Sequence, residues 1–161
     1  RCVLNAAESD LHSRAGLDLS SHDFSVHVFG AGELRDDIDL ADLRHRFTQA
    51  AEFAAQGRRD GGVLVHCASG MSRSSAVCMA HLMISEAYEL NAAARLVCAA
   101  RPTVRPGRGL WRQLRWLEDQ ISSELNRAGQ TLRCLPPPSS TQELRAAESV
   151  KEFDKLLRAP K

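Results

Sequence analysis

The sequence has neither a long hydrophobic run nor an excess of charge of one sign. Its 161 residues include 21 Lys and Arg against 20 Asp and Glu, a formal net charge of +1. A balanced chain has no global attraction for polyanions or for an anionic membrane surface. No apolar segment approaches the roughly 18 residues that a membrane-spanning helix needs, and the first residues lack the layout of a signal peptide. We therefore expect a soluble protein with neither nucleic acid nor membrane as a partner.

A metal-binding pattern is also missing. The five cysteines form no Cys-x-x-Cys pair, and no cysteine and histidine lie at the spacing of a zinc site. An odd number of cysteines favours free thiols in a reducing compartment. We expect no metal, no cofactor and a cytoplasmic location, with the nucleus as the alternative. Cys67 has a sequence environment unlike that of the other cysteines, and the histidines outside its segment are scattered without ligand spacing (His12, His22, His27, His45 and His81).

The length suits one domain with its own core. Apolar or alternating segments at residues 2–7, 24–29 and 62–66 predict strands, and the continuous apolar run of the last predicts a buried parallel strand. Helical spacing begins at residue 40, and the glycines of residues 57–62 break it. Further helices are expected at residues 74–86, 91–101 with Asn91 as N-cap, and 110–125. The order of elements predicts an α/β fold, a central mixed sheet flanked by helices.

The C-terminal part differs in composition. Prolines at positions 136–138 indicate a linker over residues 127–140, after a first domain of residues 1–126. Ser140 and Glu143 fit a capping box at the start of an amphipathic helix, residues 141–161. Its apolar stripe either packs on the same domain or serves docking or oligomerisation, and the stripe consists of Leu144, Ala147, Val150, Phe153 and Leu157.

One segment, residues 63–75, combines features that point to chemistry: Val-Leu-Val-His-Cys-Ala-Ser-Gly-Met-Ser-Arg-Ser-Ser. It predicts a strand, a short loop and a buried helix, so that backbone N–H groups converge beside a helix N-terminus. Gly70 permits the turn without a Cβ clash, and the planar guanidinium of Arg73 can hold two phosphate oxygens. The loop is therefore expected to bind an anion through Ala68, Ser69, Gly70, Met71, Ser72, Arg73 and Ser74.

Cys67 lies at the floor of this cradle. The groups that bind an anion also stabilise a thiolate, and in such surroundings a cysteine pKa falls from about 8.5 to roughly 3.5–7.5. A thiolate populated at neutral pH can attack phosphorus. Ser74 can donate a hydrogen bond to the sulfur, and His66 is expected to orient the loop rather than to carry protons. A buried structural cysteine would need no His, Gly and Arg at these spacings.

The His-Cys pair followed by Gly70, Arg73 and Ser74 resembles the phosphate-binding loop of the cysteine-dependent protein tyrosine phosphatase superfamily, and the wider spelling from Val63 looks like its dual-specificity branch. Residues 101–106 and 110–114 are similar to a later segment of that branch, and residues 2–6 to a strand near its start. The resemblance covers residues 1–126. It implies the phosphatase fold and a phosphocysteine intermediate. Because the family usually begins with further strands, the domain is expected to be truncated at its N-terminus.

The resemblance also implies a general acid, an aspartic acid on a separate loop before the cysteine. The acidic run offers four candidates, Asp36, Asp37, Asp39 and Asp42. Matching the helix after Asp42 favours Asp37, with Asp36 second. Counting forward from the strand at residues 24–29 ends near Gly30 instead, so residues 29–35 look like an insertion. The alternative is that the run is only a solvated loop and a helix start.

Two departures from the family pattern and a basic run complete the site. Ser69 replaces the usual Ala, and residues 107–110, Gly-Arg-Gly-Leu, replace Asn-x-Gly-Phe, so that the Asn that braces the loop is missing. Arg101, Arg105, Arg108 and Arg112 either line the entrance or form a solvated face.

The loop contains no Lys, which argues against the phosphoinositide-selective relatives, and no tyrosine-recognition loop is evident. The resemblance therefore implies phosphotyrosine and phosphoserine/threonine of proteins as substrates. The rival hypothesis is a catalytically weak or inactive phosphoprotein-binding module. The sequence does not indicate an oligomeric state.

Overall fold

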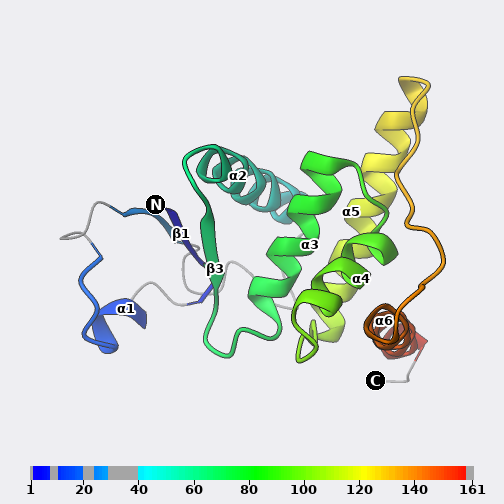
Figure 1. Cartoon of the computed structure of the whole chain (residues 1–161). Coiled ribbons are helices and arrows are strands. Elements are labelled where there is room, and N and C mark those ends of the chain that lie inside the picture. Colours follow the sequence, from blue (N-terminus) through cyan, green and yellow to red (C-terminus); the bar gives the residue numbers. More distant parts are fainter. Residues whose placement is uncertain (1, 8–10, 20–23, 29–39, 159–161) are drawn as a thin grey trace.

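The computed structural model describes residues 2–7, 11–19, 24–28 and 40–158. The small sheet lies at one end of the molecule, and the helices α3, α4 and α5 stand beyond it with α6 outermost (Figure 1). The α/β class with helices around the sheet is confirmed. Among the described residues, no helix has the length and apolarity to cross a membrane. The elements in chain order are β1 (Cys2–Asn5), α1 (Leu11–Arg14), β2 (Ser25–Val28), α2 (Leu40–Arg59), β3 (Val63–His66), α3 (Arg73–Glu86), α4 (Leu90–Ala100), α5 (Arg108–Arg127) and α6 (Thr141–Arg158).

The sheet has the order β2-β1-β3, and both pairs of strands are parallel. The expectation of a mixed sheet is therefore wrong for the described strands. Parallel neighbours follow from the long connections, because the chain passes through α1 or α2 before it returns as the next strand in the same direction. β1 is buried along its whole length between its two neighbours, whereas β2 is mostly exposed.

β3 is half-buried, not buried as its apolar sequence predicted, and its Leu64 is 62% exposed. Within the described sheet it is an edge strand, paired with β1 alone.

The helix before β3 is longer than predicted, because α2 continues through Gly57 to Arg59. Gly57 allows α2 to pack closely on β1 and β3, because a Cβ on Gly57 would collide with Cγ2 of Val63 and would lie 2.8 Å from Cβ of Cys2. The turn comes at Gly61 and Gly62, whose φ angles are 116° and 139°.

α3 forms the centre of the core and packs against α2, α4 and α5. Its predicted burial is confirmed, since Met79, Ala80 and Met83 have no exposed surface. Shortening either methionine to Ala would cost about 2–5 kcal/mol, because the surrounding helices could not close the cavity fully. The rigid packing fixes the position of the N-terminal end of α3, which meets the loop after β3.

α4 begins one residue earlier than predicted, at Leu90, and the N-cap role of Asn91 is wrong. The free N–H of Leu90 is satisfied from another helix, since it donates to Oε1 of Glu118 on α5 at 2.6 Å. Asn91 instead accepts a hydrogen bond from Arg115 at 2.8 Å. The start of α4 is thus capped by a side chain from another helix, and a local sequence pattern cannot reveal such a contact.

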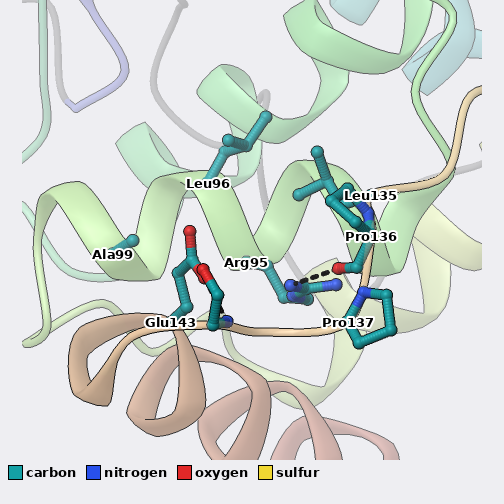
Figure 2. Close-up of a pocket in the computed structure, with 8 residues that line it drawn as sticks. Arg95, Leu96, Ala99, Leu135, Pro136, Pro137 and Glu143 are labelled. Carbon is teal, nitrogen blue, oxygen red and sulfur yellow. Dashed lines mark hydrogen bonds between the residues drawn. The ribbon is translucent and has the colours of Figure 1, made fainter.

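The segment between α5 and α6 lies along α4. Arg133 pairs with the residues around Tyr88 through a short bridge, and Nη2 of Arg95 donates to the carbonyl oxygen of Pro136 at 2.9 Å. Figure 2 shows this contact. It lies at a small cavity of about 150 Å³ that is lined by α4, the proline run and Glu143. The linker is therefore held on the helical half of the molecule.

α6 packs on its own domain, as one of the two predicted roles for its apolar side requires. Val150 and Phe153 are buried as predicted, whereas Ala146 rather than Leu144 completes the contact and Leu144 is 52% exposed. The rings of Phe153 and Trp111 meet edge to face at 5.2 Å. Trp111 also donates its indole N–H to Asp154 of α6 at 3.1 Å.

Candidate active site

The loop between β3 and α3 is anchored at its first residue by the sheet. The N–H of Ala6, just after β1, donates to the carbonyl oxygen of His66 at 2.7 Å and continues the β1–β3 pairing to the end of β3. The chain then leaves the sheet at Cys67. The predicted sequence of strand, loop and helix is confirmed, with α3 beginning at Arg73.

The far side of the loop is braced by α3 and by the segment before α5. The hydroxyl of Ser75 lies 2.7 Å from each of the carbonyl oxygens of Met71 and Ser72. The N–H of Arg105 donates to the carbonyl of Met71 at 2.9 Å, and the N–H of Gly107 donates to the hydroxyl of Ser72 at 3.0 Å. Backbone groups of residues 105–107 therefore support the loop where the expected Asn is missing.

Gly70 provides the turn that the sequence predicted, with φ of 67°. The guanidinium of Arg101 packs over it, because a Cβ on Gly70 would lie 3.2 Å from Nη2 of Arg101. A hollow of about 420 Å³ adjoins this side of the loop and is lined by Leu64, Gly70, Ser74 and Arg101 among others. Cys67 is not among the residues that line this hollow, so the hollow adjoins the loop without including the sulfur. Arg101, Arg105, Arg108 and Arg112 are exposed.

Cys67 is 7% exposed, and its sulfur lies 3.3 Å from the hydroxyl oxygen of Ser74. Burial raises the pKa of Cys67, but hydrogen bonds from the hydroxyl and N–H of Ser74 and from the N–H groups of Gly70 and Ser69 outweigh it and lower the pKa to about 7. The buried thiol of Cys98 has no such donors, and burial raises its pKa to about 11. The loop therefore stabilises the thiolate of Cys67 specifically.

Arg73 is the first residue of α3, adjacent to Ser74 and half-buried. The loop residues Ala68, Ser69 and Met71 are exposed, so that the loop over the buried sulfur is open to solvent. A thiolate among backbone N–H donors at a helix start, with an arginine as the first residue of that helix, is an arrangement that can bind a tetrahedral oxyanion and attack its central atom.

His66 contacts a residue that the sequence did not single out. Its Nε2 lies 2.8 Å from Nε2 of His12 on α1, and the ring centroids are 4.8 Å apart. Burial and the nearby His12 lower the pKa of His66, while its hydrogen bond with the backbone of Cys67 raises it. The predicted orienting role of His66 is consistent with that hydrogen bond. No local pattern could have indicated His12, which lies 54 positions away.

The general acid candidates Asp36, Asp37 and Asp39 lie outside the described residues. Asp42 lies near the start of α2, and its side chain is also outside the described part. The assignment of the acid to Asp37, with Asp36 second, stays a prediction. No group of three or more potential metal ligands occurs among the described residues.

A protein-family model described as "Dual specificity phosphatase, catalytic domain" matches residues 2–120. Among curated proteins, dual specificity phosphatase 28 of Mus musculus is 35% identical over 127 residues, 74% of this chain and 78% of the relative. Dual specificity protein phosphatase 14 of Homo sapiens is 40% identical over 90 residues, 52% of this chain and 46% of the relative. MAP kinase phosphatase with leucine-rich repeats protein 1 of Dictyostelium discoideum is 33% identical over 87 residues, which is only 10% of that protein.

Solved structures show the same relationship. The crystal structure of human DUSP28 matches with a TM-score of 0.62 and 25% identity, covering 76% of this chain and 80% of that one. A putative mouse dual specificity phosphatase complexed with zinc tungstate matches with a TM-score of 0.61 and 27% identity, covering 76% and 72%. PTPMT1, 17% identical with a TM-score of 0.64 and coverage of 79% and 81%, shares the fold.

Proposed function

Because the chain belongs to the dual specificity phosphatase family, we propose that it hydrolyses phosphorylated tyrosine, serine and threonine side chains of proteins through a phosphocysteine at Cys67. One observation carries the proposal: the thiol of Cys67 is buried, yet its pKa is lowered to about 7 by the donors around it. A substantial fraction of the nucleophile is therefore ionised at neutral pH.

In the first step the Cys67 thiolate attacks phosphorus, an S–P bond forms, and the P–O bond to the substrate side chain breaks. The N–H groups of the loop and the guanidinium of Arg73 stabilise the equatorial oxygens, on which negative charge is spread. The leaving oxygen takes a proton from an aspartic acid, which we assign to Asp37. This proton matters most for serine and threonine, because their alkoxides are poorer leaving groups than a phenolate.

In the second step water attacks the phosphocysteine. Its proton passes to the aspartate, the S–P bond breaks, and the sulfur leaves as a thiolate. The hydroxyl of Ser74, 3.3 Å from the sulfur, stabilises the departing thiolate by the hydrogen bond that also lowers the pKa of Cys67. Phosphate then dissociates, and the aspartic acid and the thiolate are both restored for the next cycle.

The openness of the loop supports this proposed breadth of substrates. Ala68, Ser69 and Met71 are exposed, and a shallow site admits the shorter phosphoserine and phosphothreonine as well as phosphotyrosine. The loop carries no Lys, which disfavours multiply phosphorylated inositol lipids as substrates.

The test is Cys67→Ser, with hydrolysis of phosphotyrosine and phosphothreonine peptides as the readout. We expect turnover to fall by at least about 10⁴-fold, on the scale of losing an essential nucleophile, while tungstate binding, measured by calorimetry, persists. Cys98→Ser is the matched control, since the Cys98 thiol is also buried but lacks the donors that lower the pKa of Cys67, and it should retain normal turnover. Normal turnover in Cys67→Ser would overturn the proposal. A wild-type chain that binds phosphopeptides without turnover would establish the binding-module alternative.

A further inference from the structure

A second imidazole lies against the residue that precedes the nucleophile. Nε2 of His12 is 2.8 Å from Nε2 of His66, within hydrogen-bond distance, and the two rings are tilted by 41°. Both side chains are half-buried. A nitrogen-to-nitrogen hydrogen bond requires one ring to donate and the other to accept, so the contact fixes where the protons of both rings lie.

The direction of this bond follows from the other partner of His66. Its hydrogen bond with the backbone of Cys67 raises the pKa of His66, as happens when the ring donates an N–H to a carbonyl oxygen. Since Nε2 faces His12, the donor to Cys67 is Nδ1. Burial, the largest influence, lowers the pKa of His66 and keeps the ring neutral. A neutral ring protonated at Nδ1 has a bare Nε2, so His12 donates its Nε2–H to His66.

Both ends of the contact are held by the fold. The register of the sheet places Asn5 beside His66, and the N–H of Ala6 donates to the carbonyl of His66 at 2.7 Å. The backbone of His12 is held within α1, because its carbonyl oxygen accepts the N–H groups of Ala15 at 3.1 Å and Leu17 at 2.9 Å. The pair therefore joins two fixed backbones, which is how a supporting residue orients a functional ring.

We propose that His12 is a positioning residue, which fixes the tautomer and the plane of the His66 ring and thereby the peptide at Cys67 from which the phosphate loop starts. The N–H groups of Ser69, Gly70 and Ser74 that stabilise the thiolate all follow this peptide in the chain. Loosening the first peptide of the loop displaces these donors from the sulfur. The inference deepens the proposed function, because it concerns the thiolate that would attack phosphate.

Two substitutions separate hydrogen bonding from packing. His12→Phe keeps a ring of similar size against His66 and removes the donor, whereas His12→Gln keeps an N–H donor on a side chain of similar reach. His45→Phe, on an exposed position of α2, controls for loss of a histidine elsewhere. The readout is the rate at which iodoacetamide alkylates Cys67, followed by mass spectrometry of the Cys67 peptide over a range of pH. Alkylation needs no turnover, so the result is independent of whether the chain is a phosphatase.

In the wild type, alkylation should be half-maximal near pH 7, the pKa of Cys67. In His12→Phe the midpoint should rise, so that the rate at a pH below 7 falls about five-fold while the rates in alkaline solution converge. His12→Gln and His45→Phe should stay within about two-fold of the wild type throughout. Equal profiles for His12→Phe and the wild type, or equal shifts in His12→Phe and His12→Gln, would overturn the proposal.

Long-range ¹H–¹⁵N spectra of the imidazoles test the same inference on the wild-type protein, without relying on a variant that folds. We expect the proton of neutral His66 on Nδ1 and a proton on Nε2 of His12. A proton on Nε2 of His66 with an unprotonated Nε2 on His12 would contradict the proposal, because His12 would then accept rather than donate.

Discussion

Two loop-to-helix junctions in this molecule gather N–H groups around an anion, one before α3 and one before α6. Before α3, the N–H groups of the loop and of Ser74 lower the pKa of Cys67 to about 7. Before α6, the N–H groups of Ser139 and Ser140 donate to the carboxylate of Glu143 at 2.6 and 3.3 Å and lower the pKa of Glu143. Both junctions use the free N–H groups and the dipole of a helix start.

The difference lies in where the anion comes from. At α6 the chain supplies it permanently, because Glu143 folds back as a capping box in which its own N–H donates to the hydroxyl of Ser140 at 3.2 Å. At α3 the internal anion is a buried thiolate, and the loop above it stays exposed. The same local physics therefore yields a structural cap where a side chain occupies the donors, and a binding site where donors remain for an external anion.

The largest expected effect concerns the general acid. Only the α3 junction needs one, because the leaving oxygen of the substrate requires a proton. Asp37→Asn should slow hydrolysis of a phosphothreonine peptide by roughly 10²–10⁴-fold, the range of general acid catalysis. An activated aryl phosphate, whose leaving group needs no proton, should slow much less. Steady-state rates with both substrates test this, and the alkaline limb of the pH–rate profile should flatten. Asp36→Asn is the control, and if neither variant shows a loss that depends on the leaving group, the acid lies elsewhere.

The next effect compares Arg73, at the α3 junction, with Arg95 of α4, which lies beside the α6 junction. Arg73→Lys keeps the charge but loses the planar pair of donors, and we expect turnover to fall by at least about 100-fold. Arg95 of α4 lies beside the α6 junction, where its guanidinium donates to the carbonyl oxygen of Pro136 (Figure 2). Arg95→Lys should leave turnover within about two-fold, since the guanidinium of Arg95 contacts the segment before α6. A near-normal rate for Arg73→Lys would mean that its side chain does not reach the phosphate.

A smaller effect concerns the hydroxyl beside the sulfur. Ser74→Ala removes a donor that lowers the pKa of Cys67, so this pKa should rise above 7 and the acidic limb of the pH–rate profile should move to higher pH. The rate at a pH below 7 should fall by about ten-fold, and less in alkaline solution where the thiol ionises regardless. The thiol of Cys98, with its pKa near 11, provides the internal reference in alkylation experiments. An unchanged acidic limb would show that the backbone donors alone set the pKa.

The smallest effect is expected at α6. Glu143→Gln should leave turnover unchanged and lower Tm by roughly 1–3 °C at pH 7, because only a solvated cap weakens. The pKa of Glu143 lies below its ordinary value of 4.5, so its stabilising contribution is present above that pH and is lost as the pH falls through the folded-state pKa. The difference in Tm between Glu143→Gln and the wild type should therefore disappear at acidic pH. A gap that persists below the folded-state pKa would mean that the carboxylate charge is not involved.

Both junctions were predictable from the sequence because their signals are local. The spacing of Cys67, Gly70 and Arg73 after an apolar run predicted the loop, and Ser140 followed by Glu143 predicted the cap. Each pattern lies within one turn of a helix or one loop, so neighbouring residues determine the geometry. The burial of α3 was predictable for the same reason, since apolar side chains cover its whole circumference.

Features that depend on contacts between distant segments could not be predicted. The glycines of residues 57–62 indicate a helix break in the sequence, although Gly57 allows α2 to approach Val63 and Cys2 closely. The braces from Arg105 and Gly107 use backbone N–H groups, which every residue except proline carries, and they leave no sequence signal. His12 and His66 are 54 positions apart, so the sequence alone does not indicate their contact. The general acid stays a prediction, because Asp37 lies outside the described residues.

The central claim is that the sulfur of Cys67, rather than any other group, takes the phosphoryl group from the substrate. The most direct measurement is to mix the chain with a ³²P-labelled phosphotyrosine peptide, quench within the first turnover in acid, and map the label by mass spectrometry. We predict one phosphoryl group per chain on the peptide that contains Cys67, absent from Cys67→Ser and unchanged in Cys98→Ser. Turnover in the wild type with no label on Cys67, or with the label on another residue, would contradict the account.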